Sequence, residues 1–347
     1  MDYLKKTEIA NCLNIARGMM ENKELVIVFN SIGFTNKIDI TQEDSDFFTN
    51  KEIGAIFDAL IESGIKVIPY NNETCFSEDI LTNKFDTSQT IVWNLSRQGS
   101  DNNQKSLVTS LSDYYQFTYL GSSVYTMNLC RHKYHFQKIL DSYKLAQIKT
   151  YTVNEFINDS NLKDGKYIIK MMKGSASRGL SKEKVNLSKE KVLSFLANNE
   201  DNSLLTIQEF VPGYEIEIPL FKIKGEFKAI GIAGVNINDK DFLDDDIMPE
   251  ELNSDNSYRF YDFINFTNKE LGYDSHFIIE LAIRIATILE IENYCRIDFR
   301  VSSNGNPYCF DISTTPYVTE HSSPNYLIDK AGFTHSDLML LILSTLA

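Results

Sequence analysis

Two aspartates in the segment YCRIDFRVSSNGNPYCFDIS are spaced to share a divalent cation. Asn304-Gly305 separates two β-rich runs and predicts a two-residue hairpin turn with positive φ at both positions. That turn would pair Asp298 directly with Asp311, and two opposed carboxylates destabilise a sheet unless something compensates them. A hard cation such as Mg²⁺ takes carboxylate oxygens as ligands, so the pair predicts a metal site.

The predicted register gives the hairpin one apolar face and one polar face. The apolar face pairs Ile297 with Ile312, Phe299 with Phe310, and Val301 with Tyr308. The polar face pairs Arg296 with Ser313 and Arg300 with Cys309, on either side of the aspartates. An alternative stays open, in which Arg296 and Arg300 simply neutralise the acids of an ordinary polar face.

A loop of small residues follows a short predicted strand that ends at Lys170, in the segment YIIKMMKGSASRGLSK. Its small residues are Gly174, Ser175, Ser177 and Gly179. Such residues let backbone N–H groups approach phosphate oxygens, and a lysine adds a point charge. The spacing matches neither the Walker loop nor the dinucleotide fingerprint, and a plain surface loop has the same composition. Lys133, in the preceding predicted helix, is either a second phosphate-binding cation or a solvated residue.

The segment TIQEFVPGYEIEIPL contains a strand that runs into Pro212-Gly213. Backbone groups left unpaired at the end of that strand can bind an adenine edge, and the Glu215 carboxylate suits ribose hydroxyls. A plain strand–turn–strand with acids facing solvent explains these residues equally well.

Three predicted units, residues 1–125, 126–205 and 206–347, would position these groups. The first unit alternates strands and helices, which predicts a small doubly wound parallel sheet with a ligand crevice at the strand ends. Its elements are strands at 25–29, 65–70 and 90–95 and a helix at 52–63.

The second and third units carry the groups described above. The second unit combines helices with strands, predicted near 128–143, 148–153, 167–170 and 189–198. The third begins with a strand near 204–211 and contains an acidic stretch at 239–255, a helix at 274–290 and the hairpin. Lys240, within the acidic stretch, could reach a terminal phosphate, although a solvated acidic loop is the simpler interpretation.

The order of these motifs resembles the ATP-grasp superfamily, and within it the D-alanine–D-alanine ligase family, from about Thr118 onward. The resemblance implies an α/β fold in which two α+β units clamp ATP, preceded by the small doubly wound domain. KMMKGSASRGLS is similar to the family's phosphate loop, with Lys170, Ser177 and Gly179 at its lysine, serine and glycine. Lys133 matches the family's other nucleotide-binding lysine.

QEFVPGYE is similar to the family's hinge, which binds adenine through its backbone. Gln208 stands where a glutamate is expected, Glu209 and Val211 would supply backbone groups, and Glu215 matches the ribose-binding acid. RIDF, DISTTPY and TEHS are similar to the family's terminal signature. The implied metal ligands are Asp298, Asp311 and Ser313.

The resemblance also implies catalytic and substrate-binding residues. Arg296 would stabilise developing oxyanion charge, and Lys170 would act on the transferred phosphate. Ser322 matches the serine that holds the carboxylate of the incoming amino acid, and Tyr317 stands where a glycine lines that site.

Several positions depart from the family's pattern. Aspartate replaces glutamate at Asp311, serine replaces asparagine at Ser313, and the N-terminal substrate motifs are not recognisable in NSIGFTNKIDITQED or NLSRQGSDNN. The nucleotide half of the resemblance is therefore better preserved than the substrate half, and we expect substrates other than two D-alanines.

The expected activity is an ATP-dependent ligase that joins a carboxylate, of an amino acid by preference, to an amine through an acyl phosphate. ATP and Mg²⁺ are the expected cofactors, with Mn²⁺ as an alternative metal. Two other functions stay open. One is a degenerate ATP-grasp protein that binds nucleotide as a regulatory or partner module, and the other is a ligase for a different acid, such as a hydroxy acid.

Composition narrows the class of protein further. The 347 residues carry 34 Lys and Arg against 48 Asp and Glu, and a formal charge of -14 argues against nucleic-acid or anionic-membrane partners. No apolar stretch is long enough for a membrane span or a signal peptide. Five scattered cysteines predict no disulfide framework, and His132 and His135 near Cys130 lack a fourth zinc ligand. We expect a cytoplasmic protein acting on small molecules, with a homodimer as an open alternative to a monomer.

Overall fold

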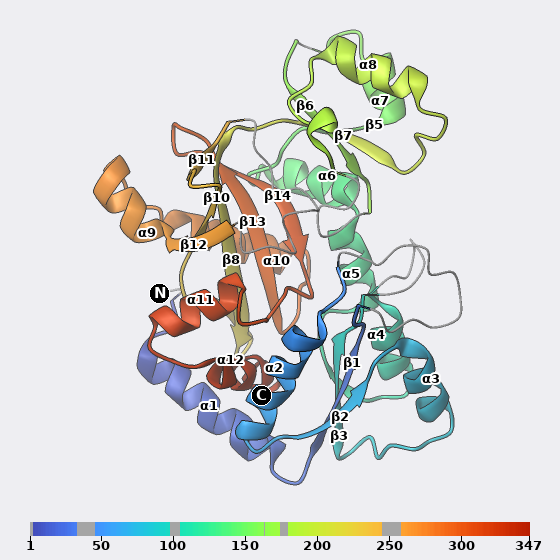
Figure 1. Cartoon of the computed structure of the whole chain (residues 1–347), viewed down its shortest axis with the longest axis vertical. Coiled ribbons are helices and arrows are strands. Elements are labelled where there is room, and N and C mark those ends of the chain that lie inside the picture. The colour runs from blue at the N-terminus through green and yellow to red at the C-terminus, as the bar shows by residue number, and fades with distance from the viewer. Residues whose placement is uncertain (1–2, 33–45, 98–104, 163, 174–179, 245–257) are drawn as a thin grey trace.

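The computed structural model describes residues 3–32, 46–97, 105–162, 164–173, 180–244 and 258–347. These residues form three sheets, which follow one another along the long axis of the molecule (Figure 1). A parallel sheet lies at one end, a seven-stranded sheet in the middle, and a three-stranded sheet at the other end. None of the described helices combines the length and the apolarity that a membrane span requires.

The parallel sheet has four strands in the order β2-β1-β3-β4. The strands are β1 (Glu24–Phe29), β2 (Lys66–Tyr70), β3 (Thr90–Leu95) and β4 (Thr118–Leu120). Helices α1 (Lys6–Met20) and α2 (Asn50–Glu62) cover one face, and α3 (Glu73–Leu81) and α4 (Leu107–Tyr114) cover the other. Covering both faces buries the apolar run of β1 completely, as in other parallel sheets. The doubly wound α/β unit predicted from the sequence is therefore confirmed.

The three-stranded sheet is antiparallel, in the order β5-β7-β6. Its strands are β5 (Thr150–Thr152), β6 (Tyr167–Met171) and β7 (Leu205–Glu209). Helices α7 (Val153–Asn158) and α8 (Lys189–Asn198) pack on it, and a 3₁₀ turn spans Lys182–Lys184. The division between residues 205 and 206 falls inside β7, which pairs with β5 and β6 and so belongs to the second predicted unit.

The seven-stranded sheet has the central order β12-β10-β8-β13-β14, with β9 and β11 paired to β8. Its strands are β8 (Gly213–Ile223), β9 (Glu226–Ala229), β10 (Ala233–Ile237), β11 (Phe242–Leu243), β12 (Tyr258–Asp262), β13 (Tyr294–Val301) and β14 (Pro307–Ser313). After β12 come a short helix α9 (Phe263–Phe266) and a π-helical turn, Thr267–Leu271. Helix α10 (Phe277–Ile288) buries its apolar side against one face of the sheet, which leaves the other face for polar groups.

Two C-terminal helices, α11 (Ser323–Lys330) and α12 (His335–Leu343), precede a 3₁₀ turn at Ser344–Leu346. Helix α12 packs against both α1 and α2 beside the parallel sheet (Figure 1). Residues Leu338 to Leu343 are fully buried in a core that also contains side chains of α1, β1 and β8. The first and last parts of the described chain thus share one hydrophobic core.

The prediction of a single helix at 128–143 is wrong, because the structure has α5 (Val124–Arg131) and α6 (Lys133–Tyr143). His132 lies between them, and its Nδ1 accepts a hydrogen bond from the His135 N–H at 3.3 Å, which caps the second helix. Lys133 is consequently the first residue of α6. Its backbone N–H donates to the Met172 carbonyl at 2.9 Å, which ties α6 to the end of β6.

The hairpin register is correct near the aspartates and wrong beyond them. Asp298 faces Asp311 as predicted, but a β-bulge then pairs Phe299 with Cys309 and Arg300 with Tyr308. The bulge is fixed from outside the sheet, because the Cys309 N–H donates to the Ala146 carbonyl at 2.7 Å and the Cys309 carbonyl accepts from Gln137 Nε2 at 2.6 Å. Cys309 therefore takes the core position predicted for Phe310.

The turn of this hairpin also differs from the prediction. Residues 302–306 form the connection, and Gly305 has a φ of 82° while Asn304 has no positive φ. The Asn304 side chain accepts hydrogen bonds from Ser302 Oγ at 2.6 Å and from the Asn306 N–H at 3.3 Å. These bonds favour a longer Asn-stabilised loop over the two-residue turn.

Candidate active site

Three adjacent strands place carboxylates in one row on the polar face of the large sheet. Glu217 of β8 faces Asp298 of β13, and Asp298 faces Asp311 of β14. Asp298 and Glu217 are 3 % and 7 % exposed, so their negative charges lie almost out of contact with water. Burial raises the pKa of both carboxyl groups, and the Arg296 guanidinium opposes that rise.

Arg296 occupies the same face as these acids and binds two of them. Its Nε and Nη2 donate to the two Asp298 carboxylate oxygens, both at 2.8 Å, in a bidentate pair. Its Nη1 lies 3.3 Å from Glu217 Oε2. The guanidinium therefore lies between the Asp298 and Glu217 carboxylates.

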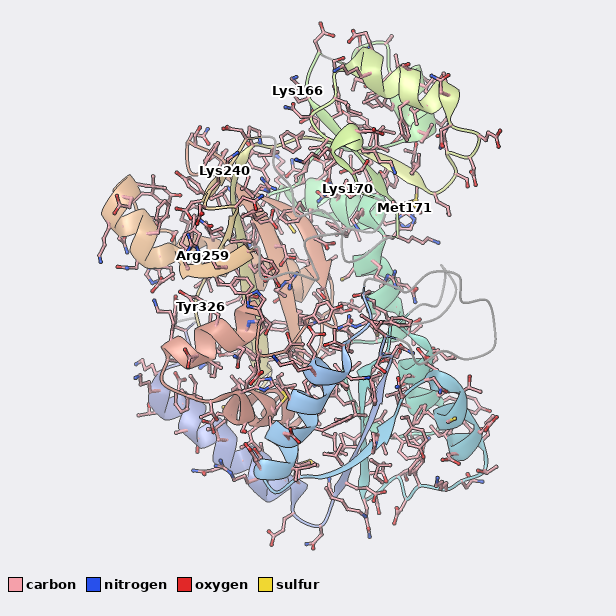
Figure 2. The ribbon with its side chains drawn as sticks, in the orientation of Figure 1. Lys166, Lys170, Met171, Lys240, Arg259 and Tyr326 are labelled. Atoms are coloured by element: carbon pink, nitrogen blue, oxygen red, sulfur yellow. The ribbon has the colours of Figure 1, made fainter. Side chains whose placement is uncertain are left out.

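The two candidate phosphate lysines come together at the edge of the same face. Lys133 Nζ lies 3.8 Å from Asp311 Oδ1, and Lys170 Nζ lies 5.1 Å from the centre of the Phe310 ring. Burial, and after it the neighbouring Lys133, lower the pKa of Lys170 to about 8, while Asp311 opposes the shift. Figure 2 shows Lys170 and Met171 at the end of β6, where the small sheet faces the large one.

The candidate ribose acid, Glu215, is held in an ion pair. Its Oε2 lies 2.8 Å from Arg300 Nη2, and the two residues face each other across β8 and β13. Arg300 also reaches the Gly213 and Leu243 carbonyls at 3.5 and 3.4 Å. Arg300 thus fixes the Glu215 carboxylate beside the connection between β7 and β8.

The candidate adenine-binding residues lie at the connection between the small and the large sheet. Gln208 is buried in the middle strand of the small sheet, and its Nε2 donates to Thr150 Oγ1 at 3.0 Å. The Glu209 N–H donates to the Lys149 carbonyl at 2.9 Å, so this N–H is engaged within the small unit. Val211 lies in the connection between β7 and β8.

The candidate metal ligand Ser313 ends β14, two residues after Asp311, and therefore lies on the same face. The candidate substrate residues Tyr317 and Ser322 follow that strand. The Ser322 hydroxyl donates to the Thr319 carbonyl at 2.6 Å and caps α11 by accepting from the Asn325 N–H at 3.4 Å. The Tyr317 hydroxyl donates to the Asp46 carbonyl at 2.6 Å, which links this segment to the N-terminal unit.

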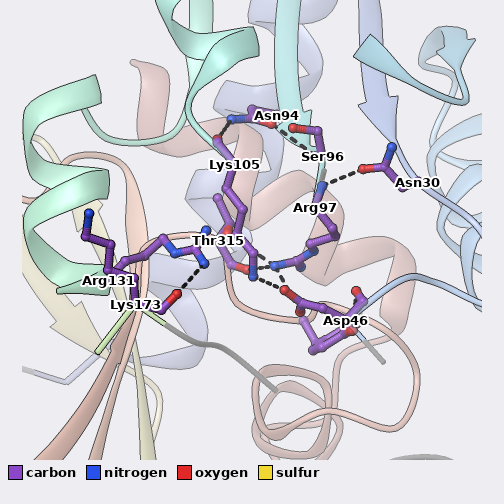
Figure 3. A network of polar contacts seen from close by, with 10 residues as sticks. Asn30, Asp46, Asn94, Ser96, Arg97, Lys105, Arg131, Lys173 and Thr315 are labelled. Atoms are coloured by element: carbon purple, nitrogen blue, oxygen red, sulfur yellow. Dashed lines mark hydrogen bonds and ion pairs between the residues drawn. The ribbon is translucent and has the colours of Figure 1, made fainter. Parts of the chain in front are cut away.

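A buried polar network joins the parallel sheet to this same segment (Figure 3). Arg97, just past β3, donates to the Thr315 carbonyl at 2.8 Å and stacks on the Tyr317 ring at 4.8 Å. The Asp46 carboxylate forms ion pairs with Arg97 and with Lys105. Burial lowers the pKa of Lys105 to about 7. The network lies at the carboxyl ends of the parallel strands, where the sequence predicts a ligand crevice.

Some predicted site residues are outside this arrangement. Ser177 and Gly179 of the candidate phosphate loop lie outside the described residues. Lys240 is an exposed residue near the end of β10, at the end of the large sheet that faces the small sheet (Figure 2). The His132 and His135 rings stack 3.6 Å apart, and no cluster of three metal-binding side chains occurs among the residues described.

Sequence reasoning missed two side chains of the site. Glu217 is one, although it lies two residues after Glu215 and strand alternation places both on one face. Phe310 is the other, because only the bulge brings its ring to the polar face beneath Lys170. No local pattern in the sequence indicates that bulge.

Known proteins resemble this chain in sequence and in fold. A family model described as "D-ala D-ala ligase C-terminus" matches residues 167–344, which is just over half of the chain. The chain belongs to the D-alanine–D-alanine ligase family. Family members are ATP-dependent carbon–nitrogen ligases, so the predicted family, ATP-grasp fold and enzyme class are all confirmed.

Curated relatives of this family member are distant in sequence. D-alanine–D-alanine ligase B of Clostridium perfringens is 23% identical over 241 residues, which cover 69% of this chain and 75% of that protein. The D-alanine–D-alanine ligase of Flavobacterium johnsoniae is 27% identical over 171 residues, 49% of each chain.

Solved structures of the family have the same fold over nearly the whole chain. The D-alanine–D-alanine ligase from Bacillus anthracis, complexed with ATP, has a TM-score of 0.65 and 15% identity, and the match covers 93% of this chain and 97% of that one. The VanG D-Ala:D-Ser ligase from Enterococcus faecalis also has a TM-score of 0.65, with 16% identity and coverages of 94% and 100%.

Proposed function

We propose that this ligase activates a substrate carboxylate with ATP and joins it to an amine, forming an amide with release of ADP and phosphate. The observation that carries the proposal is the convergence of two lysines, one arginine and three carboxylates on one face between the small and the large sheet. Such a set is suited to binding a nucleotide polyphosphate and neutralising charge during phosphoryl transfer.

In the proposed reaction, a carboxylate oxygen of the first substrate attacks the γ-phosphorus, the bond to the β,γ-bridging oxygen breaks, and ADP leaves. The amine of the second substrate then attacks the carbonyl carbon of the acyl phosphate. Phosphate leaves with the electrons of the carbon–oxygen bond, and the amine loses a proton. Lys133 and Lys170 would hold the phosphates, and Arg296 would stabilise the developing oxyanion.

The donor set at Asp298, Asp311 and Ser313 fits Mg²⁺ supplied with the nucleotide. All three side chains offer oxygen, which hard cations prefer, and Mg²⁺ in such sites takes one or two carboxylates plus substrate phosphates. The described residues contain no complete cage of metal-binding side chains, which agrees with ligands shared between protein and nucleotide. When bound, Mg²⁺ would neutralise phosphate charge and polarise the transferred phosphoryl group.

We propose further that the substrates are not two D-alanines. The support is the segment after β14, where Tyr317 and Thr315 contact Arg97 and Asp46 of the N-terminal unit instead of leaving room beside a glycine. The bulk of Tyr317 and the charges of Arg97 and Asp46 would change which substrate acid fits beside this segment.

Release of ADP, measured with acid–amine pairs, tests the activity, and trapping with hydroxylamine tests for the acyl phosphate. We expect ADP release that needs both substrates, and a hydroxamate of the acid when hydroxylamine replaces the amine. Saturable turnover with D-alanine alone would contradict the substrate proposal while supporting the ligase reaction.

A nucleotide-binding module without turnover is the second candidate. It is favoured by one observation, the engagement of both Asp298 oxygens by Arg296, which leaves this predicted metal ligand occupied. Tight ATP binding with no hydroxamate from any acid tested would support that function and contradict the ligase.

A further inference from the structure

We propose that Glu217 is a positioning residue that receives the Arg296 guanidinium when Asp298 turns to a bound cation. The inference rests on the proposed function, because it assumes that Asp298 binds the metal that accompanies ATP. The proposal adds an exchange of partners within the site, in which one partly buried arginine passes between two carboxylates on neighbouring strands.

The starting point is that Arg296 already engages both carboxylate oxygens of Asp298. Arg296 Nε and Nη2 each donate to a different Asp298 oxygen at 2.8 Å, so the guanidinium covers the open edge of the carboxylate. A cation needs lone pairs of the same two oxygens. The cation and the guanidinium are both positive and repel each other at one carboxylate, so a cation on the edge that Arg296 occupies would displace at least one of the two hydrogen bonds.

Displacement would be unfavourable if Arg296 were left without a partner. Its side chain is 19 % exposed, and a buried charge without a counter-ion destabilises a protein strongly. A second acceptor within reach is needed for the exchange to proceed. The residue that faces Arg296 in register on β8 is Pro219, whose side chain offers no acceptor.

Glu217 provides that acceptor. Its Oε2 lies 3.3 Å from Arg296 Nη1, yet this oxygen has no donor in good hydrogen-bond geometry among the described residues. The Glu217 side chain is only 9 % exposed, so water does not readily take the place of a protein donor. A rotation of the guanidinium would convert this loose ion pair into a hydrogen-bonded one.

The exchange would couple two events at the site. Loading of the cation on Asp298 would move Arg296 toward Glu217 while keeping its positive charge beside the carboxylate row. The arginine would then be placed for the oxyanion only after the metal had bound. Glu217 would serve both steps without touching the substrate.

Binding of Mn²⁺, followed by electron paramagnetic resonance with a non-hydrolysable ATP analogue present, measures this coupling without turnover. Asp298→Asn first tests the underlying site, and we expect it to abolish high-affinity Mn²⁺ binding. Glu217→Gln keeps the shape of the side chain and removes its charge. We expect it to weaken Mn²⁺ binding about tenfold, with Glu226→Gln on β9 as a matched control that changes nothing.

The decisive comparison repeats Glu217→Gln in an Arg296→Gln background. If Glu217 acts by receiving Arg296, its substitution should there weaken Mn²⁺ binding less than threefold. An equal loss in both backgrounds would mean that Glu217 binds the cation itself, or attracts it by charge alone, and would overturn the proposal. Glu217→Asp, which keeps the carboxylate, should retain most of the affinity and excludes a loss through misfolding.

Failure of this inference differs from failure of the proposed function. If Asp298→Asn leaves Mn²⁺ binding intact, the metal site is wrong and the exchange has no basis. If Asp298→Asn abolishes binding but Glu217→Gln does not weaken it, the metal site stands and only the exchange is wrong.

Discussion

Lys170 shows how strongly the surroundings of a single residue can change its chemistry. Its ammonium lies against the Phe310 ring and near Lys133, and burial lowers its pKa to about 8. A lysine with that pKa is still mostly protonated at neutral pH. Its charge is therefore available for phosphate binding over a limited range of pH.

We expect ATP affinity to fall as pH rises past about 8. Phosphate binds the protonated amine, and above its pKa each further pH unit lowers the protonated fraction about tenfold. Calorimetric titration of ATP between pH 7 and pH 9.5 measures the decline. Lys170→Arg keeps its charge throughout this range and should bind ATP with little pH dependence; a decline of the same size in that variant would assign the titration to another group.

Asp298→Asn and Asp311→Asn should each lower Mg²⁺-dependent turnover by about a hundredfold or more, because each removes a charged oxygen donor from the site. Steady-state ADP release at increasing Mg²⁺ measures the loss, and circular dichroism checks the fold. The metal assignment would be wrong if both variants kept near-normal rates at every Mg²⁺ concentration.

At the scale of elements, the break between α5 and α6 positions Lys133. The His132 cap starts α6 at Lys133 and directs that residue toward Asp311 and the end of β6. Burial lowers the pKa of His132 to about 4, and the neutral Nδ1 is the atom that accepts the His135 N–H. Protonation of this ring would therefore remove the cap.

We expect His132 to make the protein less stable as pH falls from about 6.5 toward 4. Its pKa is lower in the folded state, so the unfolded chain binds the extra proton in this range and stability is lost on acidification. His132→Asn keeps a capping acceptor that does not titrate. Urea unfolding of both proteins at several pH values should show a smaller pH dependence for the variant, and identical profiles would contradict the role of this ring.

The elements also show what sequence reasoning can reach. The Asn304-Gly305 turn prediction placed Asp298 opposite Asp311 correctly although the connection is longer than predicted, because the one-residue bulge restores the predicted register at the aspartates. The bulge could not be predicted, since its backbone is held by Ala146 and Gln137, far away in the chain. The break at His132 depends likewise on a side-chain cap that helical periodicity does not reveal.

At the scale of the whole molecule, the buried network around Arg97 connects the N-terminal unit to the segment after β14. The partners Arg97 and Thr315 are 218 residues apart, so no local sequence pattern indicates their contact. Ion pairs with Asp46 and stacking on Tyr317 complete the connection. This contact sets the distance between the parallel sheet and the candidate substrate residues.

Arg97→Met should lower the free energy of unfolding by about 3–5 kcal/mol, because it removes a partner of the buried Asp46 carboxylate. Arg17→Met is the matched control: Arg17 lies 3.9 Å from Asp337 and is half exposed, so we expect a change below about 1 kcal/mol. Denaturant unfolding measures both, and equal changes would show that the buried network contributes no more than a surface pair.

The packing of α12 against α1 and α2 has a consequence for biosynthesis. The segments that form α1, α2 and the parallel sheet leave the ribosome long before α12 has been made. The apolar surface that α12 covers therefore remains exposed until then. During that interval this hydrophobic surface is exposed and can bind chaperones or associate with other nascent chains. The N-terminal unit, although it is made first, can complete its core only when the last helix emerges.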